Sequence, residues 1–145
     1  MGYKPVQYAS WAWSAQHCTW AQATIGDAAS QARWEALALL LAMTTWQEIL
    51  MASGGNWHML GDALGMLEGA TKFRSKDPEI NFIFMEMALL IVEGGRELHA
   101  EHIWSERNAL ANAVSRLEEG ASLPRELQGV PRAKTIQPRW KILQR

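Results

Sequence analysis

Apolar residues recur at helical spacing near the middle of the chain. Trp34, Leu37 and Leu41 follow one another three or four residues apart within residues 31–51, so their side chains share one face of an α-helix. The pair Gly54-Gly55 then interrupts the pattern, as glycines commonly do after a helix. Residues 31–51 are therefore predicted to form a long helix.

Short strand patterns alternate with helical ones in the rest of the central region. Asp77-Pro78 supplies a cap and a first-turn proline for a strongly apolar helix over residues 79–93, which Gly94-Gly95 ends. Weaker patterns predict strands at residues 56–61 and 99–103, and helices at residues 63–73 and 106–119. Strands and helices in alternation favour a mixed α/β sheet covered by helices.

The two ends of the chain lack these regular patterns. Residues 1–29 are irregular and are expected to supply one or two short strands. From residue 121 onward the prolines recur every seven residues and exclude long helices. This extended tail carries six basic residues against one acid, so it could contact phosphates or serve as a solvated linker, which is the favoured interpretation. The predicted organisation is an irregular segment (1–29), a core (30–120) and a basic tail (121–145).

The composition is that of one globular domain inside a cell. Of the 145 residues 48% are apolar and 20% charged, and the net charge of −1 gives no general attraction to polyanions. The single cysteine, Cys18, cannot form an intramolecular disulfide. Without a secretory signal or an apolar run of membrane-spanning length, we expect an intracellular protein, cytoplasmic or nuclear, with no membrane partner. Its eight Trp side chains either fill the core or form exposed apolar patches that bind other molecules.

Three acidic or amide side chains fall near the starts of successive predicted elements. Glu35 lies in the first turns of the first helix, Asp62 follows the first predicted strand, and Asn112 lies in the last helix. Convergent carboxylates can hold Mg²⁺ ions that activate water for phosphodiester hydrolysis. Spacing alone is weak evidence, because Glu35 also suits a solvent-facing position near a helix dipole and Asp62 suits a cap or turn.

The other residues that could carry chemistry form weaker patterns. The four histidines lack the spacing of zinc ligands, and no second cysteine accompanies Cys18. The two glycine pairs lack the loop pattern and the following Lys of a phosphate-binding loop. The apolar stripe of residues 80–92 is interpreted as a core helix, with a partner surface as the alternative.

Three separate segments carry motifs that occur together, in this order, in one enzyme family. QARWEALALLLAM at residues 31–43 looks like a first long helix with an acidic residue, and GDALGMLEGA at residues 61–70 is similar to a strand-end acidic motif. AEHIWSERNALANAVSRLEE at residues 100–119 is similar to the closing motif and is the most specific of the three. Together they resemble the ribonuclease H-like domain of a retroelement reverse transcriptase over residues 30–120.

The resemblance implies an α/β fold with a ribonuclease H-like mixed sheet and flanking helices. It makes Glu35 and Asp62 metal ligands, and Asn112 stands where the family has its last catalytic aspartate. The polar positions of the closing motif, on the substrate side, correspond to His102, Asn108 and Arg116. The implied activity is Mg²⁺-dependent hydrolysis of the RNA in RNA/DNA hybrids.

Departures from the family pattern indicate a truncated and degenerate copy that lacks the first strands. The family's first strand carries an essential aspartate, whereas no Asp precedes Asp27 here, and residues 8–13 resemble the next strand. Asn112 has the shape of an aspartate without the charge that attracts Mg²⁺, and Trp104-Ser105 replaces a Pro-Gly turn. Two of four expected carboxylates are missing, so we expect weak or lost Mg²⁺ binding and impaired cleavage.

The resemblance also implies partners, namely an RNA/DNA hybrid or another nucleic acid and the remainder of a polyprotein. Two alternatives stay open beside it. One is a non-enzymatic interaction module that uses exposed Trp side chains for its partners. The other is a fragment that does not fold alone and aggregates because missing strands leave backbone groups unpaired.

Overall fold

Helices and two short strands alternate along the chain in the computed structural model. The structure describes residues 5–52, 54–61, 64–95, 97–104 and 108–141. In chain order the helices and strands are α1 (Ala15–Ala21), α2 (Gln31–Thr45), α3 (Gln47–Ala52), β1 (Trp57–Gly61), α4 (Leu64–Lys72), α5 (Pro78–Gly94), β2 (Leu98–His102) and α6 (Ala109–Ser115). Short 3-10 turns are η1 (Ala28–Ser30), η3 (Leu117–Glu119) and η4 (Arg125–Leu127). The class is α/β, as predicted.

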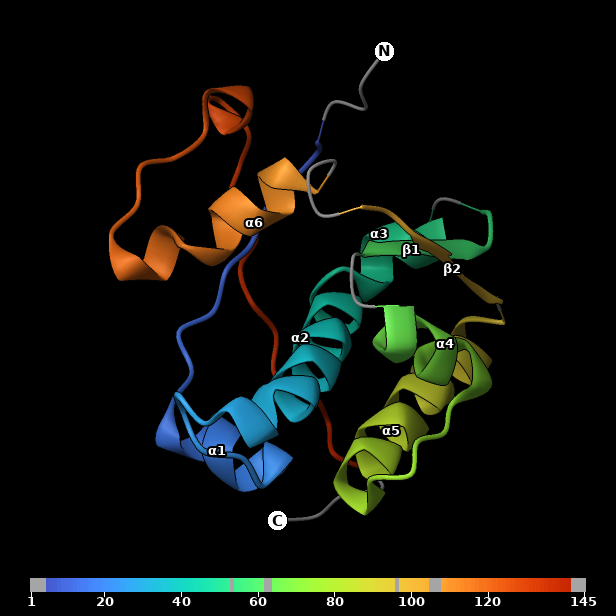
Figure 1. Ribbon diagram of the computed structural model, residues 1–145. Helices are drawn as coiled ribbons and strands as arrows, with labels where there is room; N and C mark the ends of the chain where they lie inside the picture. The colour runs from blue at the N-terminus through green and yellow to red at the C-terminus, as the bar shows by residue number, and fades with distance from the viewer. Residues whose placement is uncertain (1–4, 53, 62–63, 96, 105–107, 142–145) are drawn as a thin grey trace.

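Within the described residues, β1 and β2 form a two-stranded parallel sheet. Trp57 pairs with Leu98 and Gly61 with His102, so the two strands begin and end together. Helix α4 packs on β2, and α2 packs on both α4 and α5. These three helices therefore lie together on one side of the strands (Figure 1). The strands predicted at residues 56–61 and 99–103 are confirmed, each displaced by no more than one residue.

The core lies mainly between α2 and α5. Leu37 and Leu41 of α2 share one buried cluster with Ile83, Phe84 and Met87 of α5, and none of the five is more than 1% exposed. Burial of such side chains is the main driving force for folding. The apolar stripe over residues 80–92 is therefore a core helix, as its pattern predicts.

Most Trp side chains contribute to this core. Trp34 and Trp57 are buried, and Trp13 stacks on Trp34 with ring centroids 4.7 Å apart. Trp11 and Trp140 pack against the same cluster. Trp104 is the clear contrast, because 67% of it is exposed.

The N-terminal segment differs from its prediction. Helix α1 forms where short strands were expected, because Ser14 and His17 make a capping box: Ser14 Oγ accepts from the His17 N–H, and His17 Nδ1 accepts from the Ser14 N–H. Burial lowers the pKa of His17, which favours the neutral ring that this cap requires. Tyr8 forms an isolated bridge with Arg132, outside any strand. Over residues 5–29, the part of this segment that the structure describes, the expected strands do not form.

The long helix predicted over residues 31–51 is divided at Trp46. This residue has φ −105° and ψ 14°, away from helical geometry, and separates α2 from α3. Its indole N–H donates to Gln7 Oε1 at 2.8 Å. The break is associated with a contact to the N-terminal segment, which periodicity within residues 31–51 cannot reveal.

Asp77 begins α5 and joins it to α2. Its Oδ1 caps the helix by accepting from the Glu79 N–H at 2.9 Å, and Arg33 Nε donates to its Oδ2 at 2.8 Å. The hydrogen bond from Arg33 is the main reason that the pKa of Asp77 lies below its ordinary value. The predicted helix start is thus confirmed, and the structure adds an ion pair between two core helices.

Asp77→Ala is expected to lower the free energy of unfolding by about 1–2 kcal/mol near neutral pH, because it removes the cap and the ion pair with Arg33. Asp77→Asn keeps a capping oxygen and should cost less. A carboxyl group with a lowered folded-state pKa stabilises the fold above its unfolded-state pKa of about 3.9, and the contribution is lost as the pH falls through the folded-state value. Urea unfolding at neutral pH and at a pH below the folded-state pKa measures both effects. Losses that are the same for both variants at both pH values would contradict this account.

Candidate functional site

The carboxyl ends of β1 and β2 lie side by side, where the sequence places several candidate residues. Gly61 pairs with His102, and the Ile103 N–H donates to the Gly61 carbonyl at 2.8 Å. Asp62 follows Gly61 in the chain but lies outside the described residues. His102 is half-buried, and its ring meets that of Trp104 edge-on with centroids 5.1 Å apart. His102, which is predicted to contact the substrate, is thus paired with Gly61, the residue directly before the predicted metal ligand Asp62.

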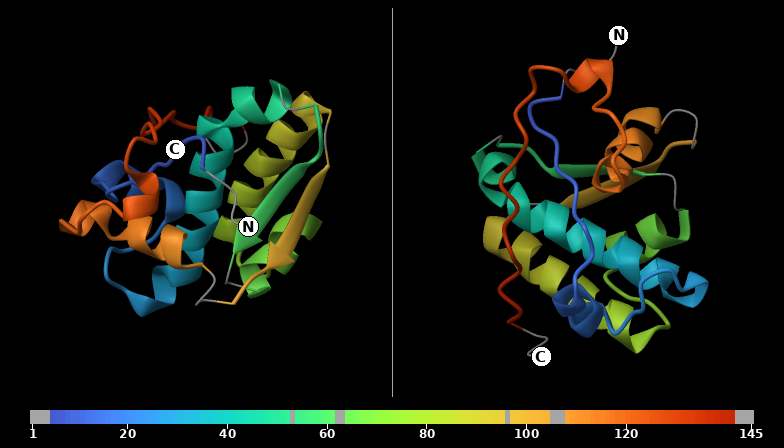
Figure 2. Two further views of the ribbon diagram at one scale, coloured as in Figure 1. Left: turned by 90° about the horizontal axis from the view of Figure 1, so that it is seen from above. Right: turned by 90° about the vertical axis from the view of Figure 1, so that its left-hand side faces the viewer.

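One hollow of about 610 Å³ joins the segments that contain the three motifs. Ala38 of α2, one turn after Glu35, lines it together with Leu60 and Ile103 at the strand ends. Helix α2 runs antiparallel to the strands, so its first turns lie toward their carboxyl ends (Figure 2). The rest of the wall comes from the N-terminal segment and α6, including Trp11, Asn108, Leu110, Ala111, Val114 and Ser115. Segments far apart in the sequence therefore converge here.

Glu35 lies near this hollow without lining it. Its side chain is half-buried in the second turn of α2, and Gln31 Nε2 donates to its Oε1 at 3.4 Å. Ala38 is the next residue on this side of the helix and does line the hollow. The Glu35 carboxylate is thus one helical turn from the hollow and is hydrogen-bonded to a neutral amide.

Helix α6 carries the other predicted site residues at different positions around its axis. Asn108, at the start of the helix, lines the hollow, whereas the half-buried Asn112 does not. Ser115 Oγ, also in the hollow wall, donates to the Asn112 carbonyl at 2.6 Å. Arg116 is exposed at the end of α6. The structure therefore brings Asn108 to the hollow and leaves Asn112 and Arg116 outside its wall.

The described residues contain no group of three His, Cys, Asp or Glu side chains that could hold a metal ion. Of the two predicted ligands, Glu35 belongs to the described residues and Asp62 does not. One carboxylate and the amide of Asn112 make a poor donor set for Mg²⁺, which prefers charged oxygen ligands. This part of the chain does not fit a two-metal site and supports no step through bound Mg²⁺.

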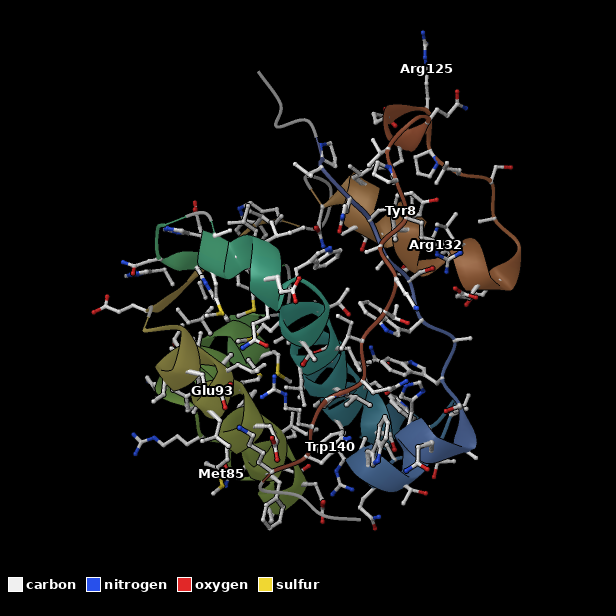
Figure 3. All side chains as sticks on the ribbon, turned by 180° about the vertical axis from the view of Figure 1, so that it is seen from behind. Tyr8, Met85, Glu93, Arg125, Arg132 and Trp140 are labelled. Carbon is white, nitrogen blue, oxygen red and sulfur yellow. The ribbon has the colours of Figure 1, made fainter. Side chains whose placement is uncertain are left out.

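The basic tail folds back over α2. Figure 3 shows it running from the region of Tyr8 toward α5. Val130 and Pro138 are buried, and the Ile136 N–H donates to Thr45 Oγ1 at 3.2 Å. The tail is therefore attached to the domain at these positions and is not a free linker, although most of its described residues are exposed.

Two glutamates hold the tail in place. Glu118 accepts from Ser10 Oγ at 2.9 Å and pairs with Arg132 at 2.5 Å, and these hydrogen bonds, that from Ser10 first, lower its pKa. Glu93 pairs with Lys141 at 2.5 Å and with Arg139 at 3.9 Å, and the hydrogen bond from Lys141 is the main reason that its pKa is lowered. Among the five basic residues of the tail that the structure describes, Arg132, Arg139 and Lys141 thus form ion pairs within the chain.

A second apolar groove of about 350 Å³ lies beside the first half of β1 and was not anticipated from the sequence. Leu39 and Met43 of α2 line one part of it, and His58 and Met59 of β1 line another. Trp46 lines both this groove and the larger hollow. No local pattern marks such a surface, because its residues come from several elements.

The chain has no detectable match among known proteins, whether a family model, a curated protein or a solved structure. Any functional proposal therefore depends on the motif resemblance and on the geometry of the hollow. Across the described ranges, no helix is both long and apolar enough to cross a bilayer.

Proposed function

We propose that the protein is a ribonuclease H-like domain of a retroelement reverse transcriptase that has lost two of its four catalytic carboxylates. The observation that carries the proposal is the hollow at the strand ends. Its wall is formed by α2, β1, α6 and Ile103, the residue directly after β2. These are the places where the three motifs lie in the sequence. The parallel arrangement of β1 and β2 supports it further, because it puts both strand-end motifs at one edge.

The ancestral chemistry would be hydrolysis of the RNA strand of an RNA/DNA hybrid with Mg²⁺. Glu35 and Asp62 would supply carboxylates, and the substrate would contact His102, Asn108 and Arg116. Asn112 puts a neutral amide where a charged oxygen would attract the cation. We infer that two carboxylates hold divalent ions too weakly for two-metal hydrolysis.

Asn112→Asp is expected to bind Mn²⁺ about tenfold more tightly than the unaltered protein, equivalent to ~1.4 kcal/mol, because it adds a charged oxygen ligand. Isothermal titration calorimetry measures the affinity. Ser122→Asp, which adds the same charge at an exposed position of the tail, is the matched control. The gain should vanish when Asp62→Asn is combined with Asn112→Asp. Equal affinities of the Asn112→Asp and Ser122→Asp proteins would contradict the role assigned to Asn112.

The same set of proteins is then incubated with a labelled RNA/DNA hybrid and Mg²⁺ or Mn²⁺. The hybrid should stay intact with the unaltered protein. Robust cleavage that disappears in Asp62→Asn would overturn the proposal that the site is impaired.

A second candidate is a non-enzymatic interaction module. It is favoured by Trp104, 67% exposed beyond the end of β2, and by the apolar character of the hollow. Light scattering and a hybrid-binding assay at low salt discriminate between the two candidates. Stable self-association without affinity for the hybrid would favour the module.

A further inference from the structure

Strand β1 has one paired edge and one open edge. The Trp57 N–H donates to the Glu97 carbonyl at 2.9 Å, and the Gly61 carbonyl accepts from Ile103 at 2.8 Å. Alternate residues of a strand direct their backbone groups to opposite edges, so those of His58 and Leu60 point away from β2. Within the described part of the chain, no backbone group is hydrogen-bonded to either residue at this edge.

The open edge adjoins the two apolar hollows. His58 and Met59 line the smaller one and Leu60 lines the larger one, while Gln7 and Trp46 line both. The two hollows therefore follow β1 from one end to the other. The left view of Figure 2 shows β2 on the outer side of the sheet and β1 on the side of α2 and α6.

The side chains that line these hollows determine what kind of molecule can bind in them. Among the described residues, neither hollow is lined by an Asp, Glu, Lys or Arg side chain. A phosphate or carboxylate placed inside either hollow would lose its hydration without gaining a counter-charge, so the interior of the hollows suits an uncharged occupant. Apolar side chains approach from Leu39 and Ala42 of α2 and from Leu110 and Val114 of α6. An occupant must therefore be apolar and must offer backbone donors and acceptors to His58 and Leu60.

We propose that the open edge of β1 binds an extended, apolar polypeptide strand from a different protein, which becomes a third strand of the sheet. Its length is about that of β1, five residues. Backbone hydrogen bonds would provide affinity and side chains in the hollows specificity. This inference shares the larger hollow with the proposed function but does not require that the domain bind or cleave an RNA/DNA hybrid.

The probe is the peptide Lys-Val-Ile-Val-Ile-Val-Lys, whose terminal lysines keep it soluble. Its binding should change the Trp fluorescence and protect the backbone amides of His58 and Leu60 from hydrogen exchange. The Met59 amide already points to β2 and should gain no comparable protection. A matched peptide with Pro in place of the central Val cannot complete the ladder and should not bind.

Two variants of the full chain test the edge itself. His58→Pro removes an outward-pointing donor while leaving the hydrogen bonds to β2 in place, and it should weaken peptide binding about tenfold. Leu60→Lys keeps the backbone and puts a charge into the larger hollow, so it should weaken binding even if His58→Pro proves unstable. Equal binding of both peptides, or unchanged affinity of both variants, would overturn the proposal. A dimer in light scattering whose His58 and Leu60 amides are protected without peptide would overturn it as well, because a second copy would then occupy the edge.

Discussion

Phe84→Ala is expected to lower the free energy of unfolding by about 3–5 kcal/mol, the usual cost of removing a fully buried aromatic ring. Phe84 is 1% exposed in the middle of α5. Its ring also fits against Gly69 of α4, where an added methyl group would lie 3.1 Å from it. The ring therefore packs between its own helix and α4, and neighbouring side chains cannot easily collapse into the cavity left by its removal.

Met85→Ala is the matched control, because the next residue of the same helix is 44% exposed (Figure 3). A substitution at such a position usually changes stability by about 0.5 kcal/mol or less. Urea unfolding followed by far-ultraviolet circular dichroism gives both values. Similar losses in the two variants would contradict the placement of the core between α2, α4 and α5.

Trp57→Ala should cost a comparable amount, about 3–5 kcal/mol. Trp57 is 2% exposed at the start of β1 and is among the largest fully buried side chains. Its loss would open a cavity under the sheet, next to the smaller groove that it helps to line. Urea unfolding measured by circular dichroism avoids the complication that a Trp has been removed.

Trp57→Phe should cost less than half as much as Trp57→Ala. The indole N–H of Trp57 is buried and has no hydrogen-bond partner within the part of the chain that the structure describes. Such a donor costs about 1–3 kcal/mol in lost hydration, and phenylalanine removes it while retaining an aromatic ring. Trp104→Ala, at an exposed position, is expected to stay within about 0.5 kcal/mol. A Phe variant as unstable as the Ala variant would show that the volume of the indole decides the stability at this position.

Local signals were sufficient to predict the central elements of the fold. Helix α5 has a cap and proline at its start, an apolar stripe along its length and Gly95 with φ 62° after its end, and each of these depends on neighbouring residues. The two strands could be predicted because turn-forming residues or predicted helices stand on both sides of each strand in the sequence. The helix expected over residues 106–119 is shorter in its described part: α6 ends at Ser115, and residues 117–119 form a 3-10 turn before Gly120, which has φ 90°.

Features that depend on distant residues were missed. The division of the first long helix at Trp46 accompanies a hydrogen bond to Gln7, and the return of the tail depends on Glu93 and Glu118. For the candidate site, Asn108 and the residues Leu60 and Ile103 at the strand ends line the same hollow. The sequence did not indicate that α6 would present Ala111 and Ser115 to the hollow instead of Asn112, because the rotation of a helix is set by its tertiary packing.

The ion pairs of the tail alter what it can offer to a nucleic acid. A free Lys or Arg that neutralises a phosphate releases a condensed counterion from the nucleic acid, and this release makes binding strongly dependent on salt. Arg132, Arg139 and Lys141 already face Glu118 and Glu93. If a phosphate binds one of these basic side chains, the glutamate that was paired with it attracts a cation from solution. The net number of ions released on binding is therefore small. RNA or DNA held by this tail would therefore lose affinity with added salt more gradually than six basic residues imply.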